Sequence, residues 1–388
     1  MSHSLDSSKK ADVLIVGGGI IGSAIALRLA RSGLSVTVID RSQPCSEASG
    51  AAAGMIAPQG EMIEPEPFSE LCATSRDLYP EFAAEVEELS EESVHYRKDG
   101  AVLAAITGEE CEELEHVYRT QTQRGLPLER LAGDNIGKLL PGLSPGIELA
   151  LFVPGDHWVD NQRLTRALIK AGERLGATYQ WNCTVMGFNV HGDQIESVCV
   201  LPEGANAETT LSAGRVILAA GCWSGQLAET FGLSLPIVPC HGEMIEFETP
   251  SEIPYVVRAG INYVVPRAAQ TALAGTTAKW GSFEKAVTAG GLQSIIRGIT
   301  RILPIAKDFK FRRAWAGLRP DTKDHLPILG LGTLRNLVFA TGHFRNGILL
   351  APITAKVIAE LILTGAPSHA LDLYSPGRFG VASKFARP

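Results

Sequence analysis

The chain has 388 residues, with 35 Lys and Arg against 42 Asp and Glu, and a formal net charge of −7. Hydrophobic residues make up 45% and charged residues 20%, which is typical of a globular protein and excludes a disordered chain. The length predicts two or three lobes. A mildly acidic chain has no basic field to attract phosphates, so we expect no nucleic-acid partner.

The cysteines predict free thiols rather than a disulfide framework or a metal site. There are seven of them, an odd number, and no two have the CxxC spacing. This pattern fits a cytoplasmic protein with no bound metal. No membrane-spanning segment is predicted either, because Asp12 and Arg28 interrupt the apolar run at 11–30, and Lys356 and Glu360 interrupt the one at 348–363.

The first elements form a βαβ unit, which predicts a parallel, doubly wound sheet. Residues 11–16 are a short apolar run, 20–32 have helical periodicity, and 35–39 alternate with β-branched residues. The motif GxGxxG, made by Gly17, Gly19 and Gly22, connects the first strand to the helix. In this context it predicts a dinucleotide site, with the pyrophosphate at the helix N-terminus. Asp40 ends the second strand, where an acidic side chain can accept the ribose hydroxyls.

The same hydrophobic periodicities predict the helices and strands of the rest of the chain. We expect helices at 68–92, 109–124, 161–175, 290–303 and 347–364, and strands at 101–106, 184–190, 194–201, 215–221 and 337–342. Residues 133–154, rich in Gly and Pro, are expected to be loops. The segments HGEMIEF, NYVVPR and TALAGTT, after Pro236, are typical of antiparallel strands.

These elements predict an α/β fold with two domains. The first is an FAD-binding Rossmann-like domain built from the discontinuous segments 11–90, 150–232 and 312–388. The second is an α+β substrate domain with an antiparallel sheet, made of 91–149 and 233–311. The glycine motif alone does not choose between NAD and FAD. The strand RVILAAG and the small-residue segment SGAAAGM favour FAD, although the latter can also be read as a simple helix start.

Several polar residues are candidates for substrate chemistry. Arg319 can grip a carboxylate with two parallel hydrogen bonds, or it can form an ordinary salt bridge. Tyr263 can close a small pocket, or it can be a packed strand residue. Arg345 precedes a long apolar helix whose N-terminus would stabilise reduced flavin, or this block is a helix start without chemistry. His343 is expected to be packed and hydrogen-bonded rather than a catalytic base.

The blocks DVLIVGGGIIGSAIALRLA, SEASGAAAGMIAP, INYVVPR, WAGLRPDTKDHLPILG and ATGHFRNGILLAP resemble the D-amino acid oxidase-like flavoenzymes, and among these the glycine oxidases. The resemblance runs from about residue 11 to residue 365. It implies that Arg319 binds the substrate carboxylate, with Arg345 beside it and Tyr263 over the pocket. It also implies further FAD contacts at Ile20, Ile21, Arg41, Ala48, Ser49, Ala53, Gly54, Met55, Val185, Phe344, Arg345, Asn346, Gly347, Ile348, Leu349 and Leu350.

The resemblance implies oxidative deamination of glycine, sarcosine or small D-amino acids, with noncovalent FAD and O2 giving H2O2, and a link to thiamine thiazole synthesis. Hydride transfer from the substrate Cα to flavin N5 needs no strong base. The alternative is a flavin dehydrogenase that passes electrons to a quinone or a partner subunit. We also expect a homo-oligomer. Where a methionine is expected in the pocket this chain has Ala278, which predicts a wider pocket unless Trp280 refills it.

Overall fold

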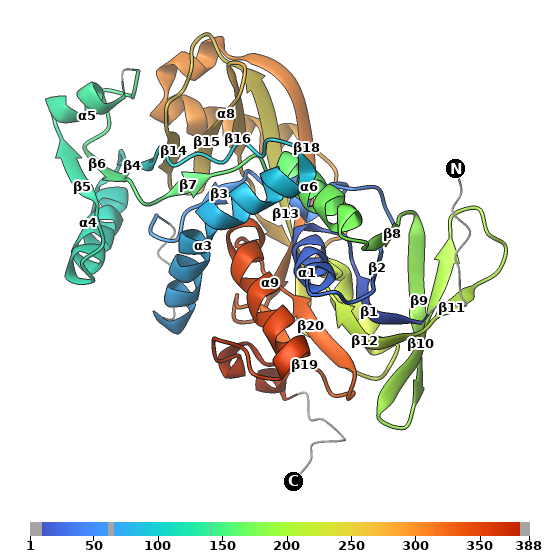
Figure 1. Ribbon diagram of the computed structural model, residues 1–388. Helices are drawn as coiled ribbons and strands as arrows, with labels where there is room; N and C mark the ends of the chain where they lie inside the picture. The colour runs from blue at the N-terminus through green and yellow to red at the C-terminus, as the bar shows by residue number, and fades with distance from the viewer. Residues whose placement is uncertain (1–9, 61–65, 141, 381–388) are drawn as a thin grey trace.

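The computed structural model describes residues 10–60, 66–140 and 142–380. Its two main sheets lie in two lobes that meet along the middle of the molecule (Figure 1). The expected α/β fold with an antiparallel sheet in its second lobe is confirmed.

The first lobe is built on a six-stranded sheet. Its order is β19 (Ile328–Leu331), β20 (Leu337–Thr341), β12 (Ala213–Leu218), β1 (Ala11–Val16), β2 (Val36–Ile39) and β8 (Thr178–Gln180). All neighbours are parallel except β19 and β20. The central strand β1 is buried over its last four residues, as expected for an apolar strand covered on both faces. The sheet therefore joins pieces of chain more than 300 residues apart.

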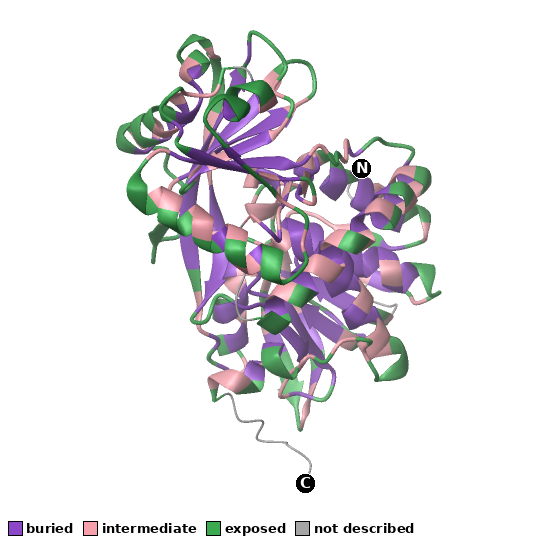
Figure 2. Ribbon diagram, turned by 90° about the vertical axis from the view of Figure 1, so that its left-hand side faces the viewer, coloured by how far each residue is buried: buried purple, intermediate pink, exposed green. Residues whose placement is uncertain are grey.

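Helices cover one face of this sheet and a β-meander covers the other. The helices are α1 (Ile20–Arg31), α3 (Glu66–Ser90), α6 (Asn161–Arg174) and α9 (Gly347–Thr364). The meander is β9 (Cys183–His191), β10 (Gln194–Pro202) and β11 (Thr209–Leu211), with α7 (Ser224–Glu229) beside it. The result is a three-layer lobe whose central strands are mostly buried, as the purple strands of Figure 2 show, while the edge strand β8 is partly exposed.

The second lobe is a nine-stranded, mostly antiparallel sheet. Only the β14–β4 pair is parallel. Its strands are β17 (Lys279–Trp280), β13 (Ile237–Glu248), β16 (Thr271–Gly275), β15 (Asn262–Arg267), β14 (Val256–Ala259), β4 (Ala101–Ala105), β6 (Leu149–Val153) and β5 (Glu129–Ala132), with β18 (Lys310–Thr322) paired to β13. Helix α8 (Ala289–Ile302) packs on one face through Ile295, Ile299 and Ile302.

Smaller elements complete the chain. They are α2 (Ala48–Ala51), β3 (Met55–Ile56), β7 (His157–Trp158), α4 (Gly108–Gln123), α5 (Asp134–Leu139) and the 3-10 turns Gly221–Trp223, Pro304–Asp308, Asp372–Tyr374 and Pro376–Phe379. Strand β3 pairs with β7 where the two lobes meet.

Most predicted elements lie within two or three residues of their observed bounds, but one prediction is wrong. Residues 133–154 were expected to be loops, yet they contain α5 and β6. Strand β6 pairs with both β4 and β5, so Leu149–Val153 belongs to the nine-stranded sheet and not to the predicted FAD-binding segment 150–232. The Gly and Pro residues around this short strand predict loops. Its partner β4 lies more than 40 residues earlier in the chain, so no local pattern indicates the pairing. The predicted FAD-binding segment 312–388 also starts too early, because β18 (Lys310–Thr322) pairs with β13 in the nine-stranded sheet. The division into two domains otherwise stays a prediction.

Helix α9 has the length and composition of a membrane span, with a mean hydropathy of 1.8. However, 61% of that stretch is buried inside the protein, where it packs against α1 and α3. This is the burial of a core helix, and its apolar residues are accounted for by packing.

Candidate cofactor and substrate site

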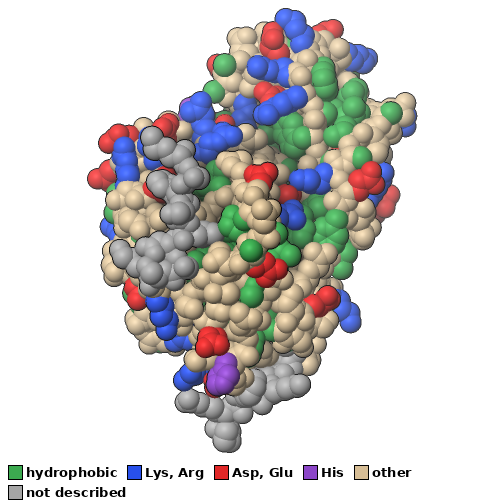
Figure 3. Space-filling view, turned by 90° about the vertical axis from the view of Figure 1, so that its right-hand side faces the viewer, with side chains coloured by type: hydrophobic (Ala, Val, Ile, Leu, Met, Phe, Trp, Pro, Cys, Tyr) green, Lys and Arg blue, Asp and Glu red, His purple; other side chains and the backbone are tan. Residues whose placement is uncertain are grey.

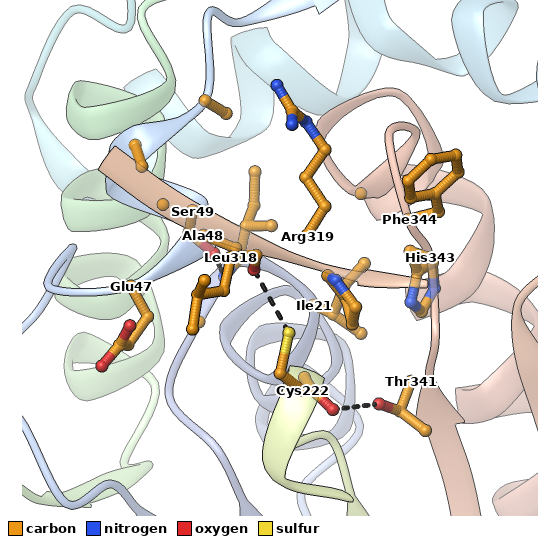
Figure 4. Close-up of a pocket in the computed structure, with 18 of the residues that line it drawn as sticks. Ile21, Glu47, Ala48, Ser49, Cys222, Leu318, Arg319, Thr341, His343 and Phe344 are labelled. Carbon is orange, nitrogen blue, oxygen red and sulfur yellow. Dashed lines mark hydrogen bonds between the residues drawn. The ribbon is translucent and has the colours of Figure 1, made fainter. Parts of the chain in front are cut away.

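One cavity of about 800 Å³ lies between the two lobes and is lined by residues from both sheets. Its size is within the usual range of small-molecule and cofactor sites, about 300–1,000 Å³. Figure 4 shows part of its wall, with Arg319 extending from its strand between Ala48 and Ser49 on one side and Phe344 on the other.

The glycine turn after β1 has the geometry of a dinucleotide site. Gly17 has φ 111°, and a Cβ there would lie 2.4 Å from the Ala219 carbonyl oxygen. A Cβ on Gly22 would lie 1.9 Å from the Gly17 carbonyl oxygen, so only glycine lets α1 pack this closely. The first residues of α1, Ile20 and Ile21, line the cavity. The helix N-terminus therefore faces a space that suits a pyrophosphate.

Asp40 lies at the carboxyl end of β2, as predicted, and lines the cavity. Its carboxylate accepts hydrogen bonds from the backbone N–H of Gly18 (2.8 Å) and of Ser42 (2.9 Å). Burial raises the pKa of Asp40, and these two hydrogen bonds oppose that shift. The side chain thus fixes the glycine turn while leaving its other lone pairs for ribose hydroxyls.

Arg41 and Val185 lie farther along the same wall. The Arg41 guanidinium stacks 3.6 Å from the centre of the Trp223 ring and forms an ion pair of 2.8 Å with Glu47. Lys285 reaches Glu47 from the other lobe at 2.9 Å. Charged groups of both lobes therefore meet at this edge of the cavity.

The small-residue segment that follows β2 lines the cavity through Ala48, Ser49, Ala53, Gly54 and Met55. The Ser49 hydroxyl accepts a hydrogen bond of 2.9 Å from the N–H of Ile20 and so ties the segment to α1. On its other side, Asn161 and Gln162 of α6 donate to the carbonyls of Ser49 and Gly50, at 2.7 and 2.9 Å. The segment presents backbone and small side chains, which suits a flat ring system.

The turn before α9 forms the opposite wall. Phe344 has φ 47°, and its N–H donates to the Pro320 carbonyl at 2.9 Å. Asn346, Gly347, Ile348 and Leu349 also line the cavity. No side chain of the described residues caps the N-terminus of α9, and the first residues of this helix line the cavity, so its free amides and its dipole are available to a ligand there.

Arg319 lies on β18 with its guanidinium over Gly242, where a Cβ would lie 2.2 Å from Nη1. It donates to the Thr276 hydroxyl at 2.8 Å and to the Thr277 carbonyl at 3.4 Å. Among the described residues it has no carboxylate within ion-pair distance, so its charge is left for a ligand. A guanidinium with one edge held by the protein can still bind a carboxylate with another.

Tyr263 is buried beside Arg319 and lines the same cavity. Within the described part of the chain, its hydroxyl donates to the Met244 sulfur alone, a weak acceptor at 3.3 Å. A Cβ on Gly275 would lie 2.6 Å from the Met244 sulfur and from the Tyr263 hydroxyl, so this position has to be glycine for both side chains to fit. The Tyr263 hydroxyl is therefore able to turn to a stronger acceptor.

Ala278 and Trp280 line the cavity as neighbours on its outer side. The Trp280 indole is 55% exposed, and its Nε1 donates to Asp321 at 2.7 Å. Ile261, also 49% exposed, lines the cavity as well. The outer part of the site is thus apolar, and Trp280 is tied toward Asp321 rather than packed over Ala278.

Arg345 and His343 have different surroundings. Arg345 is exposed and lines the cavity, whereas His343 is buried and hydrogen-bonded through Nε2 to the Thr354 hydroxyl at 3.1 Å. Burial lowers the pKa of His343 to about 3, so the ring is neutral near pH 7. The expectation that His343 is a packed histidine is confirmed.

The cavity gathers nearly all of the predicted site residues. Two of them do not line it: Gly22 faces the glycine turn, and Leu350 is buried in α9. The roles assigned to the lining residues stay predictions. Residues that the sequence did not reveal are Gly242, Gly275, Thr276 and Met244 around Arg319 and Tyr263, and Trp223, Glu47 and Lys285 at the other end.

The residues present fit FAD. Glycines leave room for a pyrophosphate, two helix N-termini face the cavity, and a wall of small residues opposes them. The surface is in keeping with a small-molecule site: on the face in Figure 3 acidic and basic side chains are mixed, with no large area of one sign.

Comparisons with known proteins agree with this site. The FAD dependent oxidoreductase family (DAO) matches residues 12–361. The bifunctional protein ThiO/ThiG of Trichormus variabilis is 36% identical over 375 residues, which are 95% of this chain and 55% of that protein. The chain thus spans about half the length of this relative. Glycine oxidase of Geobacillus kaustophilus is 32% identical over 355 residues, 90% of this chain and 92% of that protein.

The crystal structure of that Geobacillus glycine oxidase has a TM-score of 0.91, with 31% identity, and covers 96% of this chain and 99% of the other. The structure of L-proline dehydrogenase from P. horikoshii has a TM-score of 0.84 at 22% identity, a likeness of fold alone. The fold, the cofactor-shaped cavity and the family match lead to one conclusion: this chain belongs to the family of FAD-dependent oxidoreductases.

Proposed function

We propose that this protein is an FAD-dependent amino acid oxidase that oxidises glycine and other small amines or amino acids. The observation that carries the proposal is Arg319, whose guanidinium is held only by neutral groups among the described residues and faces the cavity. A partly buried cation without a counter-ion favours an anionic ligand, and a carboxylate matches its geometry. The similarity to glycine oxidases supports the same substrate class.

The chain supplies positioning rather than a base. Arg319 orients the carboxylate, Tyr263 closes over it, and Arg345 lies at the exposed side of the cavity. His343 cannot take up the substrate proton near pH 7, since burial lowers its pKa to about 3. The substrate amine therefore has to be neutral when it reacts, and its Cα–H is held toward the flavin position. The glycine turn and the N-termini of α1 and α9 would hold FAD, which would supply a two-electron acceptor for the hydride and pass the electrons on to O2, giving H2O2.

The finer parts of this proposal are the substrate range and the biological setting. An apolar outer wall suits sarcosine, D-alanine and D-proline as well as glycine. The likeness to ThiO/ThiG proteins supports a role in making the thiazole of thiamine. All seven cysteines are free, which supports a cytoplasmic location. The homo-oligomer also stays a proposal.

The test is to mix the purified holoenzyme with glycine, sarcosine, D-alanine and D-proline, with and without air. Bleaching of the flavin without air, and peroxide in air, are expected with at least one of them. Bleaching without peroxide in air would instead favour the dehydrogenase alternative. If none of the four bleaches the flavin, the proposed substrate class is wrong.

We also propose that the FAD is noncovalent. Three cysteines line the cavity, Cys183, Cys222 and Cys240, and burial raises the pKa of each, that of Cys222 to about 12. A thiolate is the form that attacks, so these thiols are poor groups for flavin attachment. Precipitating the protein with acid should leave the yellow colour in the supernatant, and colour in the pellet would contradict the proposal.

A further inference from the structure

Arg267 is a partly buried cation whose hydrogen-bond partners are all neutral. It ends β15, and its guanidinium donates to the Ala53 carbonyl (2.7 Å), the Asn161 side-chain oxygen (3.1 Å) and the Pro266 carbonyl (3.0 Å). Among the described residues no carboxylate lies within ion-pair distance of it. Asp160 and Glu246 act on it only from farther away.

A partly buried charge without a counter-ion is expensive to desolvate. Replacing Arg267 by an apolar residue would remove its hydrogen bonds to Ala53 and Asn161 but would break no ion pair. Burial lowers the pKa of Arg267 to about 10, which still leaves it charged near pH 7. The stability of the fold therefore does not explain why a charged residue stands at position 267.

The segment Ala53–Met55 lies between Arg267 and the cavity and gives this charge a function. The segment Ala53–Met55 lines the cavity, and Arg267 lies directly behind it: a Cβ on Gly54 would be 3.2 Å from Arg267 Nη2. Ala53 directs its carbonyl at Arg267, and Gly54 directs its carbonyl at the N–H of Val159, at 2.9 Å. In a trans peptide the N–H points opposite to the carbonyl. The N–H of Gly54, which shares a peptide with the Ala53 carbonyl, thus points away from Arg267, and Ala53, Gly54 and Met55 all line the cavity.

We propose that Arg267 is a positioning residue for the flavin, whose charge favours the reduced cofactor through the peptide that joins Ala53 to Gly54. The proposal rests on FAD occupying this cavity. Reduced flavin carries more negative charge than oxidised flavin, so a fixed cation and aligned N–H dipoles stabilise it selectively. In an interior with an effective dielectric constant of about 20, a unit charge acts over several ångströms.

The experiment replaces Arg267 by Met in the holoenzyme and measures the midpoint potential of the bound flavin. Loss of the charge should lower the equilibrium constant for two-electron reduction at least tenfold, which is a shift of about 30 mV to more negative potential. Binding of sulfite, which forms an anionic flavin adduct, should weaken in the same direction. An unchanged potential would overturn the proposal.

Asn161→Ala is the matched control. It removes a partner of Arg267 and the donor to the Ser49 carbonyl, but no charge. We expect its reduction equilibrium constant to stay within threefold of the wild type. If Asn161→Ala shifts the potential as much as Arg267→Met does, the role is structural and the proposal is wrong.

Arg267→Lys serves if Arg267→Met does not retain FAD. A lysine buried here should have a lower pKa than the arginine, so its charge should be lost as the pH rises toward 10. The potential of this variant should then fall relative to the wild type between pH 7 and pH 10, and a constant difference would refute the proposal. Potentials are measured without any amino acid, so this result is independent of whether the substrate class proposed above is correct.

Discussion

The two ends of the cavity are built in different ways. At the cofactor end, much of the wall is backbone, glycine and the N-terminus of α1, which lie close together in the chain from Gly17 to Met55, and the N-terminus of α9 adds the opposite side. At the substrate end, Arg319, Tyr263, Met244 and Ala278 come from four strands or their ends and meet only in the folded sheet. A backbone site tolerates little change, whereas a side-chain site can be retuned by single substitutions without disturbing the cofactor.

Removing the carboxylate anchor is expected to have the largest effect on activity. Arg319→Met should lower kcat/KM by roughly 10²–10³-fold, because breaking a buried charge pair costs about 3–5 kcal/mol. FAD content should not change. Arg312→Met, an exposed arginine on the same strand, is the control and should stay within threefold. Steady-state kinetics with the best substrate decides, and an Arg319→Met enzyme within threefold of wild type would contradict the assignment.

The rigidity of the cofactor end is tested by the substitution Gly22→Ala. The added Cβ would lie 1.9 Å from a backbone oxygen of the glycine turn, so the turn has to move. We expect FAD affinity to fall at least tenfold, measured as flavin bound per chain after dialysis. Gly137→Ala places its Cβ in open space within α5 and should keep full occupancy. Equal occupancy in both variants would mean that the cofactor end is not as rigid as its geometry implies.

The substrate end should be adjustable through Ala278. With Trp280 tied to Asp321, D-proline or sarcosine should equal or exceed glycine in kcat/KM. Ala278→Met should then lower kcat/KM for D-proline relative to that for glycine by about 10–100-fold, since one or two methylenes are worth about 1–3 kcal/mol. A wild-type preference for glycine above about a hundredfold would show that the pocket is already closed.

Acid should destabilise the protein through two histidines, the buried His343 at the cofactor end and the partly buried His157. Burial lowers the pKa of His343 to about 3 and that of His157 to about 4, against 6.5 in the unfolded chain. Below pH 6.5 the unfolded state binds these protons and the folded state does not, so stability is full above that pH and falls as the pH drops toward 4. We expect Tm to fall by about 5 °C between pH 7 and 4.5, and by less in His157→Phe. A constant Tm would contradict this.

The same contrast explains what could be predicted from the sequence. Strand, glycine turn, helix and Asp40 are contiguous, so local periodicity and one motif suffice to place them. Thr276, Gly242 and Gly275 carry no local signal, since each matters only because β13, β16 and β18 lie side by side. Strand β6 was missed for the same reason. The resemblance to a family supplied Arg319 and Tyr263, which periodicity alone left as ordinary residues.

The discontinuous six-stranded sheet has a consequence for the synthesis of this protein. Strand β1 needs β12 as its neighbour, β12 needs β20, and α9 follows β20 in the core. A nascent chain that has just released its glycine motif from the ribosome therefore has neither the sheet nor the helix that complete the cavity. Its long-range pairing should make folding slow. Fragments that end before β20 should bind no flavin, and the cofactor can enter only after β20 and α9 have been synthesised.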